Sequence, residues 1–267
     1  MIETKSEKLN SILKELGSFV VAFSGGVDSS FLLYRAHTLL KRNVLAVTIR
    51  TPYIPAREVT EAVEFTSKYG IRHSIINLEI PDSIRKNPLK RCYLCKKTLF
   101  TQLIDFARRN DLRFVVDGSN ADDTGDYRPG LKALEELSIR SPLLEAGMTK
   151  EEIRQLSKAA GLDTWDKPAY ACLLTRVPYD TEIDQDTLRM VEAGESMLFE
   201  QGFPGTRVRV HDNMARIECI PGFIDKIIQR QTREHIVTEM KKIGFRYVSL
   251  DLEGYRTGSY NPEIKEK

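Results

Sequence analysis

The stretch "VVAFSGGVDSSFLLYRA", from Val20 to Ala36, joins an apolar run to an apolar-rich segment through a Ser-Gly-Gly break. The run predicts a buried strand, and the second segment predicts a helix. Backbone N–H groups converge at a helix N-terminus, which favours anions, and glycine lets the main chain approach a phosphate closely because it has no Cβ. The break is therefore predicted to hold a phosphate group through Ser24, Gly25, Gly26, Asp28 and Ser29.

Strands and helices alternate downstream of this break. Strands are predicted at residues 19–23, 44–49, 73–77 and 114–117, and helices at 29–40, 56–69, 93–109 and 150–160. This alternation is typical of parallel strands with crossover helices, so we expect an α/β fold with a doubly wound parallel sheet. Beyond about Arg176, two alternating segments, a helix at 223–243 and a final strand predict a smaller α+β domain. The expected domains are 1–177 and 178–267.

Composition excludes several classes of protein. The 267 residues contain 40 Lys and Arg against 38 Asp and Glu, and this balance lacks the basic excess of non-specific nucleic-acid binding. No apolar stretch is long enough to span a membrane, and the charged N-terminus does not resemble a signal peptide, so we expect a cytoplasmic protein. In the cytosol, the four cysteines are expected to act as ligands or nucleophiles rather than form disulfides.

The string "SGGVDS" resembles the pyrophosphate-binding loop of the ATP-pyrophosphatase (PP-loop) superfamily. A Walker A loop is excluded, because its G-x-x-x-x-G-K-[ST] spacing is absent. The resemblance implies that ATP is split into AMP and pyrophosphate while a substrate is adenylated, that Mg²⁺ neutralises developing charge, and that Asp28 is catalytic.

Two longer stretches narrow the resemblance. The segments "VVDGSNADDTGDYRPGLKALEELSIRSPLLEAGMTKEEIR" and "WDKPAYACLLTRVPYD" resemble the LarE family of sulfur transferases, and the similarity extends over nearly the whole chain. The family converts a carboxylate of a pyridinium biscarboxylate mononucleotide to a thiocarboxylate on the way to a nickel-pincer cofactor. The resemblance therefore implies a small-molecule carboxylate nucleotide as substrate and a homo-oligomer, namely a trimer-based hexamer.

Two polar segments are candidate ligand-binding loops. "DGSNADD" follows a strand, which places Ser119 and Asn120 at the carboxyl edge of the sheet, where open α/β folds bind ligands. Asp122 or Asp123 could hold Mg²⁺, although an Asx-rich turn has the same composition. "DYRPGLK" contributes Arg128 and Lys132 as phosphate or carboxylate partners, or else forms a solvated basic loop.

Cys92 and Cys95 form a C-x-x-C pair in the basic run "KRCYLCKK", from which Lys96 is a candidate substrate contact. A zinc knuckle lacks a second ligand pair, and a thioredoxin-like pair lacks its usual fold. Members of the resembled family that carry three cysteines bind a 4Fe-4S cluster. This resemblance implies that Cys92, Cys95 and Cys172 hold such a cluster, with one iron open for a sulfide. The alternative is that Cys172 gives up its own sulfur.

Arg207 and Arg209 alternate with valines in "TRVRVHDNMARIE", so both should point to one face of a strand. Glu218 repeats this parity on the next strand. The two guanidinium groups fit a substrate phosphate, and the family resemblance favours that assignment. The alternative is a solvated sheet face with cross-strand ion pairs.

Other functions share the loop. A tRNA-thiolating enzyme would need a broad basic surface or an added RNA-binding domain, and the net charge of +2 argues against it. An ammonia-dependent amidating ligase would have no use for three cysteines. A nucleotide sensor would keep the loop without turnover.

Overall fold

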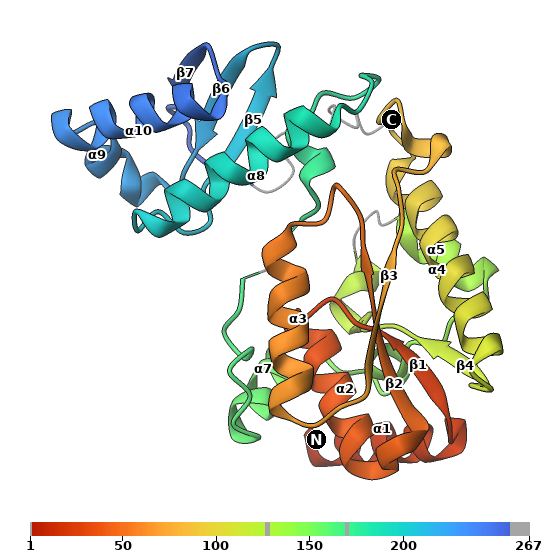
Figure 1. Cartoon of the computed structure of the whole chain (residues 1–267). Coiled ribbons are helices and arrows are strands. Elements are labelled where there is room, and N and C mark those ends of the chain that lie inside the picture. The colour runs from red at the N-terminus through yellow and green to blue at the C-terminus, as the bar shows by residue number, and fades with distance from the viewer. Residues whose placement is uncertain (1, 126–128, 169–170, 257–267) are drawn as a thin grey trace. The chain divides into compact units, whose positions relative to one another are not determined.

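A computed structural model describes residues 2–125, 129–168 and 171–256. By the contacts between residues the chain divides into two compact units (Figure 1). Unit 1 contains residues 1–84 and 89–170, and unit 2 contains residues 85–88 and 171–267. The helices and strands of each unit are described separately.

Unit 1 is built on a four-stranded parallel sheet in the order β3-β2-β1-β4. The strands are β1 (Phe19–Ala22), β2 (Val44–Arg50), β3 (His73–Asn77) and β4 (Phe114–Val116). The α/β parallel sheet expected from the sequence is confirmed. After β1 the chain adds strands on one side, and it then returns to place β4 on the other side. This reversal makes the β1–β4 boundary the topological switch point, where α/β sheets bind ligands.

Helices connect and cover these strands. They are α1 (Ile2–Leu16), α2 (Val27–Leu40), α3 (Ala56–Lys68), α4 (Arg91–Arg109), α5 (Pro129–Glu136), α6 (Pro142–Glu145) and α7 (Lys150–Ala159). Thr149 caps α7: its side chain accepts from the backbone N–H of Glu152, whose carboxylate accepts in return from the N–H of Thr149. This capping box fixes the first turn of α7.

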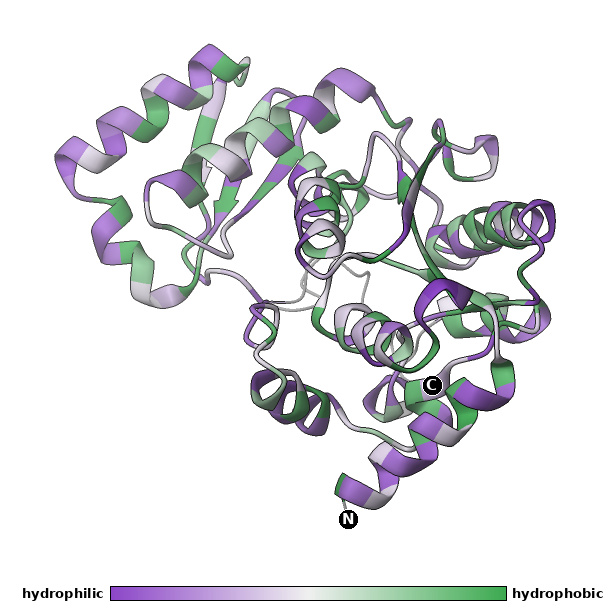
Figure 2. Ribbon diagram, turned by 60° about the horizontal axis from the view of Figure 1, so that its bottom comes forward, coloured by the Kyte–Doolittle hydropathy of each residue, from purple (hydrophilic) through white to green (hydrophobic). Residues whose placement is uncertain are grey.

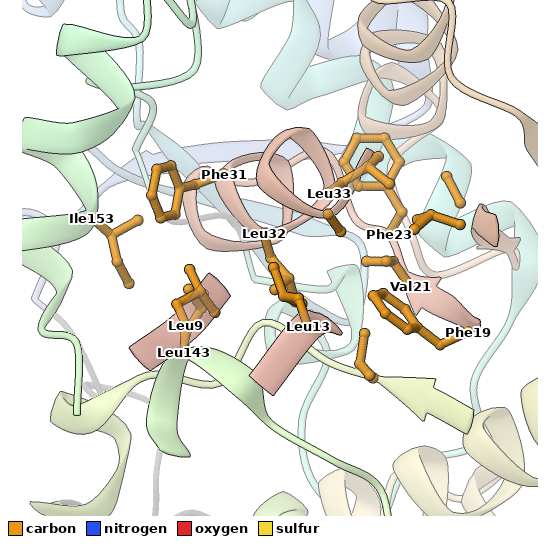
Figure 3. Close-up of a cluster of buried hydrophobic side chains, with 14 of the residues drawn as sticks. Leu9, Leu13, Phe19, Val21, Phe23, Phe31, Leu32, Leu33, Leu143 and Ile153 are labelled. Carbon is orange, nitrogen blue, oxygen red and sulfur yellow. The ribbon is translucent and has the colours of Figure 1, made fainter. Parts of the chain in front are cut away.

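Alternate residues of β1 serve two hydrophobic clusters. Phe19 and Val21 face a core formed with α1 and α2 (Figure 3), and Val20 faces a second core with Phe100 and Leu103 of α4. Because side chains alternate along the strand, β1 contributes buried residues to both faces of the sheet. Figure 2 shows the result, with largely hydrophobic strands and helices that carry both hydrophobic and hydrophilic residues. Burial on both faces makes the position of β1 the most strongly fixed in the unit.

Unit 2 contains a three-stranded sheet in the order β5-β6-β7, antiparallel and then parallel. Its elements are α8 (Gln185–Glu200), β5 (Arg207–His211), β6 (Met214–Glu218), α9 (Ile224–Ile227), α10 (Arg230–Ile243) and β7 (Tyr247–Leu250). The prediction of a single helix at 223–243 is wrong. Gln229 has extended backbone angles (φ −55°, ψ 137°), which interrupt the helix and separate α9 from α10.

Asn87 holds residues 85–88 in unit 2. Its buried side-chain amide donates to the carbonyl oxygens of Leu174, Val177 and Pro178 at 3.2, 3.0 and 2.8 Å. The backbone of Asn87 lies in the left-handed region (φ 46°), which asparagine tolerates better than most residues. We call this contact the Asn87 clip.

In the described part of the chain, no helix combines the length and the apolar character that crossing a bilayer requires.

Candidate active site

A cavity of about 410 Å³ opens at the carboxyl edge of the unit 1 sheet. The loop after β1, the first turn of α2 and the loop after β4 all line it. These are the two strand ends at the topological switch point, so the sheet itself determines where the cavity lies. Its volume is typical of a small-ligand site.

The Ser-Gly-Gly loop forms one wall of this cavity. The Ser24 and Ser29 hydroxyls are 3.0 Å apart, and the N–H of Ser30 donates to the carbonyl of Gly26 to start α2. Gly26 caps this helix without a side-chain hydrogen bond. Gly25 has a positive φ of 69°, and a Cβ there would lie 3.4 Å from the backbone of α3 at Ala62. Glycine therefore permits both the turn and its close packing.

The loop after β4 packs directly against the same helix turn. A Cβ on Gly118 would lie 3.0 Å from the backbone nitrogen of Ser29, so only glycine fits there without a shift. Just before it, the buried carboxylate of Asp117 accepts hydrogen bonds from the hydroxyls of Ser119 (2.5 Å) and Ser141 (2.6 Å). The Ser119 hydroxyl is thus used to fix the loop.

The acidic residues that follow form a turn, as the Asx-rich composition allowed. Asn120 accepts at its side chain from the N–H of Asp122, and Asp123 accepts from the N–H of Asn120, both at 3.0 Å. Asp123 lines the cavity. Asp122 is exposed and accepts instead from the N–H of Lys150 at 2.8 Å. Between the two candidates for Mg²⁺, the geometry favours Asp123.

Asp28 lies at the start of α2 and forms an ion pair with Lys150, whose Nζ is 2.5 Å from Asp28 Oδ2. Burial raises the pKa of Asp28 and the nearby Asp123 carboxylate adds to this, while the ammonium of Lys150 opposes both. Asp28 Oδ1 is buried without a hydrogen-bond partner among the described residues. A carboxylate with a buried, unused oxygen at a phosphate-binding loop is suited to hold Mg²⁺.

Lys167 supports the loop from the far end of the unit 1 sequence. Its Nζ donates to the carbonyl of Gly25 at 2.8 Å and pairs with the carboxylate of Glu61 on α3. The side chain is 13% exposed. Sequence reasoning missed both Lys150 and Lys167. For Lys150 a signal was present, because a lysine at the first position of a capped helix opposes the helix dipole.

Much of the remaining cavity lining is an apolar wall. Phe23 and the side chains of β2 and α4 form it, together with Ile54 and Val59. Thr48 lies within this wall and donates to the carbonyl of Phe23 at 2.8 Å. An apolar surface beside a phosphate-binding loop is suited to a planar base joined to a phosphate.

The basic candidates are placed differently. Lys96 lines the cavity, and its alkyl chain packs against Gly130, where a Cβ would lie 2.8 Å from Lys96 Cδ. Lys132 is exposed on α5 and is not part of the cavity lining. Arg128 lies outside the described residues.

None of the four cysteines is in a disulfide. Cys92 and Cys95 lie one turn apart near the start of α4 in unit 1, where Cys95 Sγ is 3.2 Å from the hydroxyl of the buried Tyr53. Cys172 is in unit 2, directly before a 3-10 turn (Leu173–Arg176). Cys219 is buried, as expected of a small core residue. Within the described ranges, no group of three or more His, Cys, Asp and Glu side chains is placed to hold a metal ion.

Arg209 and Glu218 form a buried ion pair in unit 2, with Arg209 Nε 3.0 Å from Glu218 Oε2. The other oxygen of Glu218 accepts from Arg216 at 2.8 Å. Arg207 lies 3.8 Å from Glu195 and stacks over Tyr255. The sheet face expected from the alternation is therefore ion-paired, but it is buried and not solvated.

The fold and cavity define a class of protein: a nucleotide-binding enzyme with a PP-loop at the switch point of a parallel sheet. A family model described as NAD synthase matches residues 1–109. A protein of Lactiplantibacillus plantarum named pyridinium-3,5-bisthiocarboxylic acid mononucleotide synthase is 36% identical over 98% of this chain and 96% of its own.

Two further relatives are named only as uncharacterised proteins. The one from Synechocystis is 39% identical over 98% of both chains, and the one from Methanocaldococcus jannaschii is 35% identical over 94% of this chain and 96% of its own. The chain belongs to the LarE family of sulfur transferases, within the PP-loop class. That membership makes it an enzyme and implies ATP with Mg²⁺.

Proposed function

We propose that this protein adenylates a carboxylate of pyridinium-3,5-biscarboxylic acid mononucleotide and converts it to a thiocarboxylate, a step in nickel-pincer cofactor synthesis. The observation that carries the proposal is the cavity at the β1–β4 switch point, lined by Ser24 to Ser29, in a chain that matches the bisthiocarboxylate synthase over 98% of its length. The reaction is proposed for the cytosol, and the trimer-based hexamer remains a prediction.

In the first step, the adenine base occupies the apolar wall and the phosphates lie on the Ser24 to Ser29 loop. The substrate carboxylate oxygen attacks the α-phosphorus, and the bond from that phosphorus to the bridging oxygen breaks. Pyrophosphate leaves with the electron pair. Asp28 and Asp123 would hold Mg²⁺, which supplies positive charge for the leaving group. Ser119 and Asn120 fix the loop beside them.

In the second step, sulfur attacks the acyl-adenylate carbon, a C–S bond forms, and AMP leaves with the former carboxylate oxygen. Lys96 would contact the substrate from the cavity wall. Phosphate or carboxylate contacts by Arg128 and Lys132 stay a prediction from the sequence, because Lys132 does not line the cavity and Arg128 lies outside the described residues. Arg207 and Arg209, with Glu218 as the partner that orients Arg209, would receive the substrate phosphate.

The sulfur source is proposed to be a 4Fe-4S cluster held by Cys92, Cys95 and Cys172. None of the three is in a disulfide, and the first two lie at positions one helical turn apart, which suits two thiolate ligands of one group. When bound, the cluster would supply a replaceable sulfide. The alternative is that Cys172 donates its own sulfur.

Product analysis tests the adenylation step. With ATP, Mg²⁺ and the biscarboxylate mononucleotide, the protein should form AMP and pyrophosphate in equal amounts. ADP as the product would contradict the proposal, and an amidated product formed from ammonia would indicate the ligase alternative.

A second experiment tests the sulfur source. Protein reconstituted anaerobically with iron and sulfide should bind both close to cluster stoichiometry, and mass spectrometry should find Cys172 intact after turnover. Loss of H₂S from the Cys172 side chain would instead establish sacrifice of that residue.

A further inference from the structure

The peptide bond between Gly25 and Gly26 has a fixed direction in this structure. The carbonyl oxygen of Gly25 accepts a hydrogen bond from Lys167 Nζ at 2.8 Å. In a planar trans peptide the C=O and the N–H point in opposite directions, so the N–H of Gly26 points away from Lys167. Gly26 lines the cavity and Lys167 does not. This N–H therefore lies on the cavity side of the loop.

The N–H of Gly26 is available to a ligand in the cavity. Its contact with the hydroxyl oxygen of Ser24 is long, at 3.4 Å, and that hydroxyl lies 3.0 Å from the hydroxyl of Ser29. A negatively charged phosphate oxygen is a stronger acceptor for an N–H than a hydroxyl at this distance. Exchange of the weak internal contact for a phosphate contact is therefore favourable.

The two glycines do not select this direction by themselves. Turning a peptide over changes mainly ψ of the residue before it and φ of the residue after it. Gly25 has a φ of 69° and Gly26 a φ of −78°, and glycine populates both signs of φ about equally. The turned peptide would present the carbonyl oxygen of Gly25 to the cavity, where it would repel a phosphate. The direction must therefore be set by an interaction from outside the pair.

Lys167 is held at both ends, as a residue with this role requires. Its ammonium pairs with the carboxylate of Glu61 on α3, and its side chain is 13% exposed. Its backbone carbonyl accepts from the guanidinium of Arg154 on α7 at 2.8 Å. A second guanidinium N–H of Arg154 donates to the carbonyl of Trp165 at 2.7 Å. One helix thus fixes the backbone of Lys167, and another fixes its charge.

We propose that Lys167 is a positioning residue that holds the Gly25–Gly26 peptide with its N–H directed at a phosphate of the bound nucleotide. Lys167 acts through the peptide and does not itself touch the phosphate. Without Lys167 the peptide turns over in part of the molecules, and each of these loses a donor and gains a repelling carbonyl. The inference rests on the proposed function only in placing a phosphate on this loop.

Isotope labelling tests the proposal directly, because Gly25 and Gly26 are the only adjacent glycines in the chain. The full-length protein is produced with [1-¹³C,¹⁵N]glycine and unlabelled serine. An NMR experiment that correlates each amide N–H with the preceding carbonyl carbon then gives one signal, from the Gly26 N–H and the Gly25 carbonyl. In wild type, pyrophosphate with Mg²⁺ should shift the amide resonance.

The variant Lys167→Met should change that signal in two ways. The carbonyl resonance of Gly25 should move before any ligand is added, because the hydrogen bond to Lys167 is lost. At saturating pyrophosphate the amide resonance of Gly26 should shift much less than in wild type. Calorimetric titration should show pyrophosphate binding weakened about tenfold, the effect of one hydrogen bond to a charged group. Binding of adenosine, which has no phosphate, should change less than about twofold.

Three variants serve as controls. Glu61→Gln breaks the ion pair but leaves the ammonium beside the Gly25 carbonyl, so thermal stability should fall while pyrophosphate affinity stays within about twofold of wild type. Lys68→Met removes another lysine, one whose exposed ammonium pairs with Asp163, and should change neither the affinity nor the signal. Lys167→Arg keeps a charged donor and should recover most of the affinity and the amide shift. It also preserves the test if the methionine variant fails to fold.

The proposal is overturned if the Gly26 amide of wild type does not respond to pyrophosphate. It is also overturned if the amide of Lys167→Met shifts as in wild type at saturation, which would mean that Lys167 attracts pyrophosphate by charge alone. Equal loss of affinity in Glu61→Gln and Lys167→Met would indicate a purely structural ion pair and would overturn it too.

Failure of this inference is distinguishable from failure of the proposed function. Formation of AMP and pyrophosphate by a protein whose Gly26 amide does not respond would refute the role of Lys167 and leave the adenylation chemistry standing. Formation of ADP by a protein that shows the expected amide shift would refute the adenylation chemistry and leave the role of Lys167 standing.

Discussion

The cavity of unit 1 and the sheet face of unit 2 both contain ion pairs between basic groups and carboxylates, but the paired side chains differ in their exposure to solvent. The Asp28 and Lys150 side chains are 20% and 33% exposed and share one contact. The Arg209 and Glu218 side chains are 5% and 2% exposed, and both oxygens of Glu218 are used. A partly exposed pair can exchange a partner for a ligand, whereas breaking a buried pair leaves an uncompensated charge.

This difference separates two roles for similar residues. In unit 1 the carboxylates are available to a metal and a nucleotide. In unit 2, Glu218 primarily sets the position of two arginines, so any phosphate contact there would be made by guanidinium groups already fixed in direction. The following predictions test whether the two regions differ in this way.

The largest expected effect is on chemistry in unit 1. Asp28→Asn removes the carboxylate proposed to hold Mg²⁺, and formation of AMP and pyrophosphate should fall by about 10²-fold to 10³-fold. The melting temperature should change little, because asparagine keeps the size of the side chain and both partners of the pair are partly exposed, Asp28 to 20% and Lys150 to 33%. As a control, Asp163→Asn alters an exposed carboxylate that pairs with Lys68 and should keep full activity. Full activity in Asp28→Asn would mean that the loop has been misassigned.

A second prediction concerns stability in unit 2. Glu218→Gln leaves the buried Arg209 with a neutral partner, while Arg216 keeps its pair with Asp251, and it should destabilise unit 2 by about 3–5 kcal/mol. Hydrogen exchange of the β5 and β6 amides measures the loss. The matched change Glu239→Gln breaks a surface pair with Lys242 and should change stability far less. Equal effects would erase the contrast between the two regions.

A third prediction concerns the shape of the loop. At Gly25 the backbone angle φ is +69°, so Gly25→Ala should cost about 1–2 kcal/mol of stability from the left-handed conformation alone. It should also weaken ATP binding. Gly222→Ala is the control, because Gly222 has no positive φ and open space at the Cβ position. Thermal unfolding and nucleotide titration together check both effects, and unaltered ATP affinity would separate loop shape from function.

The smallest expected effect is a pH dependence near the cavity. Burial lowers the pKa of His73 below its usual value of 6.5, and its ring lies 2.9 Å from the hydroxyl of Thr48 in the cavity wall. Below about pH 6.5 the unfolded chain takes up a proton that the folded chain does not, so the free energy of unfolding should fall as pH decreases through this window.

Replacing the ring isolates that contribution. In His73→Gln, part of the loss of stability between pH 7 and pH 5 should disappear, as measured by denaturant unfolding at each pH. His235→Gln, at an exposed position on α10, is the matched control. An identical pH profile in wild type and His73→Gln would show that other groups cause the dependence.

The fold of unit 1 could be predicted from local pattern. Each of its four strands lies within two residues of its expected position. For β1 and β2 the reason is that strands buried on both faces appear as continuous apolar runs. The phosphate-binding loop was also predictable from a local pattern, because the glycines and the serine hydroxyls are close together in the sequence at the junction of β1 and α2. The cavity lining includes Ser24, Gly26, Asp28 and Ser29.

Long-range contacts could not be predicted in this way. Lys150 and Asp28 are separated by 122 positions, and Lys167 and Gly25 by 142, so no local pattern connects them. The burial of Arg209 was missed for a related reason. The alternation predicts which residues share a face of the strand, but it does not predict whether the charged face is buried by the rest of the protein.

The Asn87 clip has a consequence for dissecting the protein. Because residues 85–88 belong to unit 2 and are flanked on both sides by unit 1, the polypeptide passes from one unit to the other three times. A fragment beginning at residue 171 would expose three carbonyl oxygens that Asn87 normally binds. Cutting the chain at one point therefore does not separate the two units. A recombinant unit 2 would need residues 85–88 supplied as an added peptide or fused through a new linker.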